Sequence, residues 1–459
     1  MKRRCSIGVA VGMVLLASGP LSAEDSAGTY AIVASSFLGG RGFDDAVVGA
    51  RIQSDGTIVL AANLAPDIAR HIQGAGKGGG TVIRLSADGT KVLSVKTVAS
   101  EVKDMAVDAK DSIVLAAGDD GVIKLNADGA RQVWTARMRG CVRVDAAADG
   151  HVAAIADGRI HVLDPAGKVI GRADGSHYTC DVCIDGASKT VVFTGFRNAR
   201  AFDGKRTYPV QICYVHGLDY KGKRKWTNYN WSTDRTSDRF LNKPTNNMAD
   251  SRGDRCTIGR DGRLYVTFQV AGGNHLFRYS PRDIMTKSPI VGGDNYHKFH
   301  NSRAEHKCFF ARFSAATGDY LAGQQFCGRL SSGRANAVVT KEGEITADEA
   351  GRVYVVGRAA SGLPLTMNPG GEDYTGGGFI LVMSPDLKTR LLVTRTAAGK
   401  GSPRALDVRT TKGKTRAVWG GSGVVEGMFV TNAVQERAVD VAAGKKDPKD
   451  AFFAVIEKK

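Results

Sequence analysis

Residues Ala347 to Val355 read Ala-Asp-Glu-Ala-Gly-Arg-Val-Tyr-Val, a polar turn with glycine followed by a short apolar strand. The same pattern returns along the chain, and three further copies are Ile52–Leu60, Val107–Leu115 and Ile258–Val266. A turn of this kind between apolar runs predicts a β-hairpin, because the tight turn needs a positive φ that glycine adopts without strain. The stretch therefore indicates a β-unit that repeats.

A second hairpin follows each copy. Val82–Leu85 precedes Asp88-Gly89, and Val122–Leu125 precedes Asp128-Gly129. Four antiparallel strands in each unit, repeated about seven times, predict an all-β fold, a seven-bladed β-propeller with four-stranded antiparallel blades. The blades are expected to begin near Asp44, Glu101, Cys141, His177, Asp254, Glu344 and Arg404.

The two ends of the chain predict how the ring closes. Residues Asp450–Ile456 have the pattern of a third strand with no fourth strand after it. Residues Tyr30–Gly40 have the pattern of a fourth strand with no third strand before it. We expect the N-terminal strand to join the C-terminal blade, which would remove an exposed sheet edge.

Three segments carry a resemblance to a known group: Ser36–Gly40, Asp348–Gly357 and the strand Ala451–Val455. They resemble the repeats of bacterial extracellular seven-bladed β-propeller proteins, best in blades one, six and seven. The resemblance implies a fold and an exported setting. It implies no reaction, because this fold hosts many functions.

The N-terminus has the features of a secretory signal. Lys2, Arg3 and Arg4 precede an apolar stretch, and Leu21-Ser22-Ala23 forms a small-residue cleavage site. We expect residues 1–23 to be cleaved and residues 24–459 to form a single propeller domain in the periplasm or outside the cell. The apolar stretch is too short for a transmembrane anchor, and no later stretch is long enough.

The net charge of +17 favours polyanionic partners in general. No run of five basic residues occurs, so scattered basic side chains on solvated strands are the alternative, and no specific nucleic-acid partner is expected. We expect a monomer.

Two long polar loops, residues 227–253 and residues 281–306, are predicted on the same face of adjacent blades and make that face the first choice for a binding site. Aromatic rings beside amides and charged groups are suited to glycan recognition. The candidate ligand-binding residues are Tyr229, Trp231, Arg235, Asp238, Asn246, Asn247 and Asp294. In the alternative interpretation, Trp226 matches Trp134 as a packing residue and the next aromatic residues cap the same strand.

The second loop also holds His297, His300 and His306, a group that could bind a divalent metal cofactor such as zinc. Their spacing matches no established motif, and water-exposed histidines are the alternative. No other cofactor is predicted.

Seven cysteines remain after the expected cleavage. A two-residue turn at Thr317-Gly318 would place Cys308 opposite Cys327, which predicts a disulfide between them. Cys141, Cys180, Cys183 and Cys256 lie near first strands, which line the channel of a propeller, and are interpreted as buried structural thiols or a disulfide.

Three functions stay open at this level. The favoured one is a non-catalytic exported propeller that binds a glycan or protein through one loop face, since no catalytic motif is found in the sequence. The second is a polysaccharide lyase or hydrolase that uses His and Arg residues of the blade-five loops. The third is an envelope scaffold protein.

Overall fold

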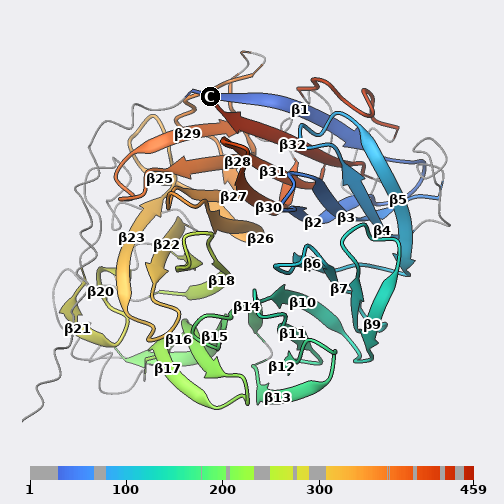
Figure 1. Cartoon of the computed structure of the whole chain (residues 1–459). Helices are drawn as coiled ribbons and strands as arrows, with labels where there is room; N and C mark the ends of the chain where they lie inside the picture. Colours follow the sequence, from blue (N-terminus) through green and yellow to red (C-terminus); the bar gives the residue numbers. More distant parts are fainter. Residues whose placement is uncertain are drawn as a thin grey trace, which may run out of the picture.

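The computed structural model describes residues 29–66, 79–176, 178–202, 207–231, 249–271, 276–288, 307–369, 371, 373–395, 401–423, 429–439 and 449–459. Seven four-stranded antiparallel sheets are arranged as blades around a central channel (Figure 1). This confirms the predicted all-β, seven-bladed fold. The signal sequence predicted at residues 1–23 lies outside the described residues.

Blades one to four follow one another along the chain. Their strands are β2 (Ala46–Ile52), β3 (Ile58–Leu64), β4 (Gly79–Leu85) and β5 (Val92–Ala99); β6 (Asp104–Val107), β7 (Ile113–Ala116), β8 (Val122–Leu125) and β9 (Gln132–Ala136); β10 (Cys141–Ala146), β11 (Val152–Ala156), β12 (Arg159–Leu163) and β13 (Val169–Asp174); and β14 (Thr179–Asp185), β15 (Thr190–Phe202), β16 (Thr207–Asp219) and β17 (Arg224–Tyr229).

Blades five to seven carry the remaining sheets. Their strands are β18 (Ser251–Ile258), β19 (Leu264–Val270), β22 (Lys307–Phe313) and β23 (Tyr320–Phe326); β26 (Val338–Ala347), β27 (Val353–Ala360), β28 (Gly376–Met383) and β29 (Arg390–Arg395); and β30 (Ser402–Thr411), β31 (Lys414–Ser422), β32 (Ala451–Lys458) and β1 (Tyr30–Leu38). Short elements outside the blades are η1 (Leu276–Arg278), β20 (Tyr279–Ser280), β21 (Asp283–Lys287), β24 (Gly328–Arg329) and β25 (Ala335–Asn336).

The ring closes through β1. This strand pairs antiparallel with β32, with Ser36 opposite Phe453 and Phe37 opposite Phe452, so the last blade has the order β1-β32-β31-β30. The closure predicted from the two chain ends is therefore confirmed. The N-terminal strand supplies the outer strand of blade seven and covers an edge that β32 would otherwise expose.

Apolar side chains fill every interface between neighbouring blades. The buried residues form seven clusters, and each cluster joins two adjacent blades. The cluster between blades seven and one, for example, contains Leu38, Ile58 and Val418. Because each sheet is covered on both faces by its neighbours, second strands such as β3, β7 and β11 are apolar at nearly every position.

Tryptophans in two outer strands attach a blade to the next one. The indole Nε1 of Trp134 donates to the carbonyl oxygen of Pro165 at 3.0 Å, and that of Trp226 donates to the carbonyl oxygen of Ala315 at 3.0 Å. The interpretation of Trp226 as a packing residue equivalent to Trp134 is confirmed.

The two faces of the ring differ in their connections. On one, which we call the plain face, short turns join the first strand to the second and the third to the fourth, as at residues 53–57 and 86–91. On the other, which we call the elaborated face, lie the links between blades and the connections between second and third strands. Elements η1, β20, β21, β24 and β25 all belong to the elaborated face.

Blade four extends on the elaborated face into an arm formed by β15 and β16. Beyond Gly195 and Tyr214 these two strands pair only with each other, because β14 and β17 end there. Val210 and Ile212 of the arm are buried in one cluster with Phe277 of the blade-five insertion. The arm and the blade-five insertion thus share a small apolar core beside the ring, which the sequence did not predict.

Deletion of residues 30–40 should lower the melting temperature far more than removal of Lys458 and Lys459. The deletion removes a whole outer strand and its apolar contacts, whereas the two lysines end the chain on the partner strand. Circular dichroism melting of both variants measures the difference. Equal and small shifts would contradict a closing role for β1.

Candidate functional site

The two aromatic residues predicted to bind a ligand are buried. Tyr229 is 4% exposed and Trp231 is 7% exposed. Their rings meet edge to face at 5.2 Å, and Tyr229 also packs against Phe268 and Phe277, each at 5.1 Å between ring centres. Burial raises the pKa of Tyr229 well above its usual value. Both residues therefore hold the arm and the blade-five insertion together.

The other predicted ligand and metal residues lie outside the described residues. They are Arg235, Asp238, Asn246, Asn247, Asp294, His297, His300 and His306. Both loops are shorter than predicted. Strand β17 continues to Tyr229, and residues 279–287 of the blade-five insertion form the hairpin of β20 and β21. The glycan and metal roles stay predictions.

The predicted pairing of Cys308 with Cys327 rests on a register that is wrong by one residue. A bulge at Arg312 and Phe313 shifts the pairing of β22 with β23, so Cys308 lies opposite Phe326. A shift of one residue turns a side chain to the other face of the sheet. Among the described residues no disulfide joins these cysteines, which are buried thiols in this structure.

The channel is lined by the first strand of each blade, and neighbouring first strands contact one another around the whole ring. As predicted, Cys141, Cys183 and Cys256 lie on these strands, and Cys180 lies on β14 with them. These strands also bring charged side chains inward. In chain order, blades one to six present residues whose sign alternates: Arg51, Asp104, Arg143, Asp181, Arg255 and Glu344.

These six side chains form what we call the channel network. Arg51 pairs with Glu344 at 3.4 Å, and Arg143 pairs with Asp181 at 3.7 Å. Burial disfavours the charged form of Arg51, but Glu344 and other carboxylates outweigh it and raise the pKa of that guanidinium. Since buried charges are stable only with partners of opposite sign, the alternation lets six ionisable groups share one narrow channel.

Carboxylates on the first strands also join consecutive blades. Asp104 accepts a hydrogen bond from the backbone N–H of Val144 at 3.1 Å, and Asp181 accepts one from Cys256 at 2.9 Å. In the same way, Asp145 accepts the amide N–H of Ile184, Glu344 accepts that of Leu406, and Asp407 accepts that of Ile52. Five of the seven junctions between blades therefore carry a carboxylate bound to the next backbone.

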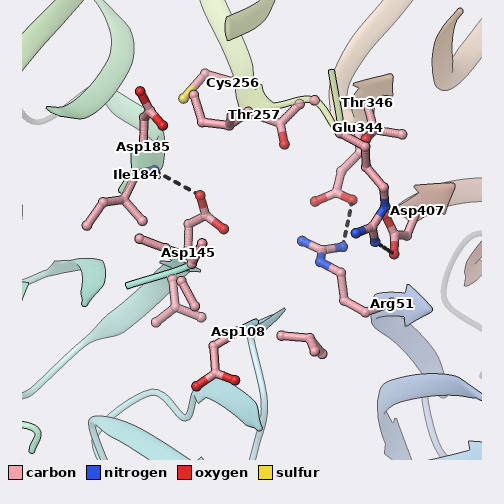
Figure 2. A pocket seen from close by; sticks show the side chains of 18 of the residues that line it. Arg51, Asp108, Asp145, Ile184, Asp185, Cys256, Thr257, Glu344, Thr346 and Asp407 are labelled. Atoms are coloured by element: carbon pink, nitrogen blue, oxygen red, sulfur yellow. Dashed lines mark hydrogen bonds and ion pairs between the residues drawn. The ribbon is translucent and has the colours of Figure 1, made fainter. Parts of the chain in front are cut away.

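A cavity of about 430 Å³ occupies the channel. Residues of the plain-face turns line it, including Ala109, Ala148, Ala187 and Gly259, so the cavity opens on the plain face. Figure 2 shows Asp108, Asp145 and Asp185 on one side of the cavity, and Arg51 with Glu344 and Asp407 on the other. One wall is therefore acidic, and the other is formed by charged groups of both signs that pair with one another.

Two of these carboxyl groups titrate near neutral pH. Burial raises the pKa of Asp145 to about 7, although the amide of Ile184 and the charge of Arg51 act against it. Burial likewise raises the pKa of Glu344 to about 7 against the charge of Arg51. The cavity thus holds carboxyl groups whose charge changes within the physiological range.

The channel residues are not among the predicted site residues, because the recurring aspartates, as in Asp88-Gly89, have the pattern of turn residues. That assignment is right for Asp55 and Asp386, each of which accepts a backbone N–H two residues later. The available signal was a charged residue inside an apolar first strand, as in Val-Arg-Val-Asp at residues 142–145. Charge at a position whose neighbours are buried indicates a partner inside the fold.

Comparison with known proteins identifies the family. The family model described as outer membrane protein assembly factor BamB matches residues 48–177 and residues 78–318, and the second match alone covers more than half of the chain. The chain belongs to this family. Among the described residues of this BamB-type chain, no helix is long and apolar enough to cross a membrane.

Solved structures similar to this BamB-type propeller share little sequence with it. U3-55K is 9% identical with a TM-score of 0.48 over 92% of this chain and 98% of that one. BamB from Moraxella catarrhalis is 12% identical with a TM-score of 0.41, over 94% and 100%. The β-propeller domain of Cps50 (Swd1) from Myceliophteria thermophila is 8% identical with a TM-score of 0.46, over 86% and 99%. No curated protein matches the sequence.

Replacement of Asp407 by alanine should destabilise the ring by about 2–4 kcal/mol, because a buried N–H and a guanidinium would lose their acceptor. Asp407 accepts from the amide of Ile52 and from Arg260, each at 2.8 Å, and so connects blade seven to blades one and five. Urea unfolding measures the change. Asp88→Ala, in an exposed turn, should cost less than half as much, and similar losses would contradict a junction role for Asp407.

Asp145→Asn should stabilise the protein at pH 8 and have little effect near pH 4. The folded-state pKa of Asp145, about 7, lies above the ordinary value of 3.8, so ionisation costs stability as pH rises from about 4 to about 7. The neutral amide avoids that cost, which we expect to be about 1–3 kcal/mol. Melting temperatures measured across this range test the sign.

Asp386→Asn is the matched control for the pH experiment. Hydrogen bonds from Ser384 and from the amide of Lys388 outweigh its partial burial and lower the pKa of Asp386. Its replacement should therefore destabilise the protein at pH 8. A difference between Asp145→Asn and the unmodified protein that does not vary with pH would contradict the prediction.

Proposed function

We propose that this protein is an exported, non-catalytic β-propeller that acts as a scaffold in the bacterial envelope and holds a protein partner on its elaborated face. The family description, outer membrane protein assembly factor, supports a role in the assembly of outer membrane proteins. The predicted signal sequence at residues 1–23 supports export to the periplasm.

The observation that carries this proposal is the distribution of exposed apolar side chains. Among the described residues, the large hydrophobic side chains that remain exposed are Phe43, Leu93, Val133, Val142, Tyr178, Leu321, Leu330, Phe429 and Val439. Six of these nine lie on blade links, at the entry to a first strand or on the connection from β31 to β32, all at the elaborated face.

The other three exposed hydrophobic residues lie on the outer strands β5, β9 and β23 at the circumference, and none lies on a described turn of the plain face. Phe43, Leu330 and Phe429 are each about two-fifths exposed. Exposed apolar groups gathered on one face favour contact with another protein, since their burial is the main favourable term in association. The arm of blade four widens the same face.

Site-specific photo-crosslinking tests the proposal. A photoreactive amino acid at position 330 or 429 should give one discrete crosslinked protein in the cell envelope of the native host. The same group at Lys110 or Lys221, which are exposed on plain-face turns, is the matched control and should give none. Mass spectrometry then identifies the product.

Each outcome bears on a different part of the proposal. A partner that belongs to the outer membrane protein machinery would support the assembly role. A discrete partner with no connection to outer membrane proteins would reject assembly and keep the scaffold. Equal crosslinking from both faces would reject the elaborated face as the docking surface. Phe429→Asp should weaken a correct complex by tenfold or more, about 1.4 kcal/mol.

A further inference from the structure

The cavity on the plain face presents a carboxylate without an ion pair among the described residues and a guanidinium whose ion pair is long. The first is Asp145 on the acidic wall. Its carboxylate accepts a hydrogen bond from the amide of Ile184 at 2.9 Å, and among the described residues no ion pair involves it. By contrast, Asp108 beside it is paired with Lys124 at 2.8 Å. Figure 2 shows the Asp145 carboxylate directed into the cavity.

The second group is Arg409 of blade seven, which also lines the cavity. It donates to the carbonyl oxygen of Ile52 at 3.1 Å and forms a long ion pair with Asp111 at 3.8 Å, which is beyond hydrogen-bond distance. Burial and then the positive charge of Arg260 lower the pKa of Arg409. Arg260 is itself paired with Asp407 at 2.8 Å, so Arg409 is the guanidinium of this wall that a ligand anion can approach.

These two groups belong to different walls of the channel, since Asp145 lies on blade three and Arg409 on blade seven. A ligand that satisfies both needs a positive group and a negative group at separate ends. A volume of about 430 Å³ is within the range of pockets for small molecules. No group of three described His, Cys, Asp or Glu residues is arranged to hold a metal ion, which points to an organic cation at the acidic wall.

We propose that the plain-face cavity binds a short linear peptide of two or three residues, with its terminal ammonium at Asp145 and its terminal carboxylate at Arg409. Charge-assisted hydrogen bonds at both ends orient the peptide across the channel. The cavity opens away from the exposed apolar residues of the elaborated face, so this site does not depend on the scaffold function.

Trialanine is the probe, and calorimetric titration of the full mature chain measures its affinity. Acetylation of the amino terminus or amidation of the carboxyl terminus removes one charge at a time. Each blocked peptide should bind about tenfold more weakly or worse, since each loses a hydrogen bond between charged groups. Free alanine, whose two charges are adjacent, should bind more weakly than trialanine.

Two variants test which side chain binds which end of the peptide. Asp145→Asn keeps an acceptor for the Ile184 amide and should weaken trialanine and its amide about tenfold, with no effect on the acetylated peptide. Arg409→Gln should weaken trialanine and the acetylated peptide, with no effect on the amide. Lys221→Gln, on a plain-face turn outside the cavity, is the control. Melting curves without peptide verify that each variant is folded.

The proposal is supported if each variant weakens only the peptides that carry the terminal charge its residue binds. It would be overturned if trialanine did not bind, if blocked peptides bound as tightly as the free one, or if both variants weakened every peptide equally. Crosslinking from the elaborated face has no bearing on these outcomes, so failure of the peptide site and failure of the scaffold function are distinguishable.

Discussion

The pairing of β1 with β32 is the interaction on which the rest of this molecule depends. A propeller blade buries both of its faces, so a blade beside a gap would expose one apolar surface to water. Residues of β1 belong to both interfaces of blade seven: Ala34 and Leu38 pack toward blade one, and Tyr30 and Phe37 pack toward blade six. One N-terminal strand therefore completes two of the seven apolar interfaces and the last sheet.

Closure also places the first strands close enough for their polar groups to meet. Five junctions use a carboxylate that accepts the backbone N–H of the next blade. At the junction of blades five and six, Arg255 instead donates to the carbonyl oxygen of Gly343 at 2.7 Å. At the junction of blades one and two, Gly49 has no side chain and lies directly against Met105. Charged side chains thus join the first strands at six of the seven junctions.

The ring itself could be predicted from sequence because each repeat carries a local signal. Strand alternation and turn chemistry need no knowledge of distant residues, and the predicted blade starts at Cys141 and Arg404 lie close to β10 and β30. The arm of β15 and β16 was not predicted, because its strands continue those of the blade without a change in the sequence pattern. The Cys308 pairing failed because a bulge, which depends on local packing, changes the register by one residue.

The channel charges show why a composition cannot indicate a ligand. The whole chain has a net charge of +17, which favours polyanions in general, yet seven carboxylates and four guanidiniums line the cavity. Salt screens distant charges beyond about 10 Å, so a group inside the channel responds to its immediate neighbours rather than to the protein surface. These neighbours come from the seven first strands, which are far apart in sequence. The strands meet only in the closed ring. A chain that is basic on average therefore still presents Asp145, a carboxylate with no ion pair among the described residues, at the centre of the fold.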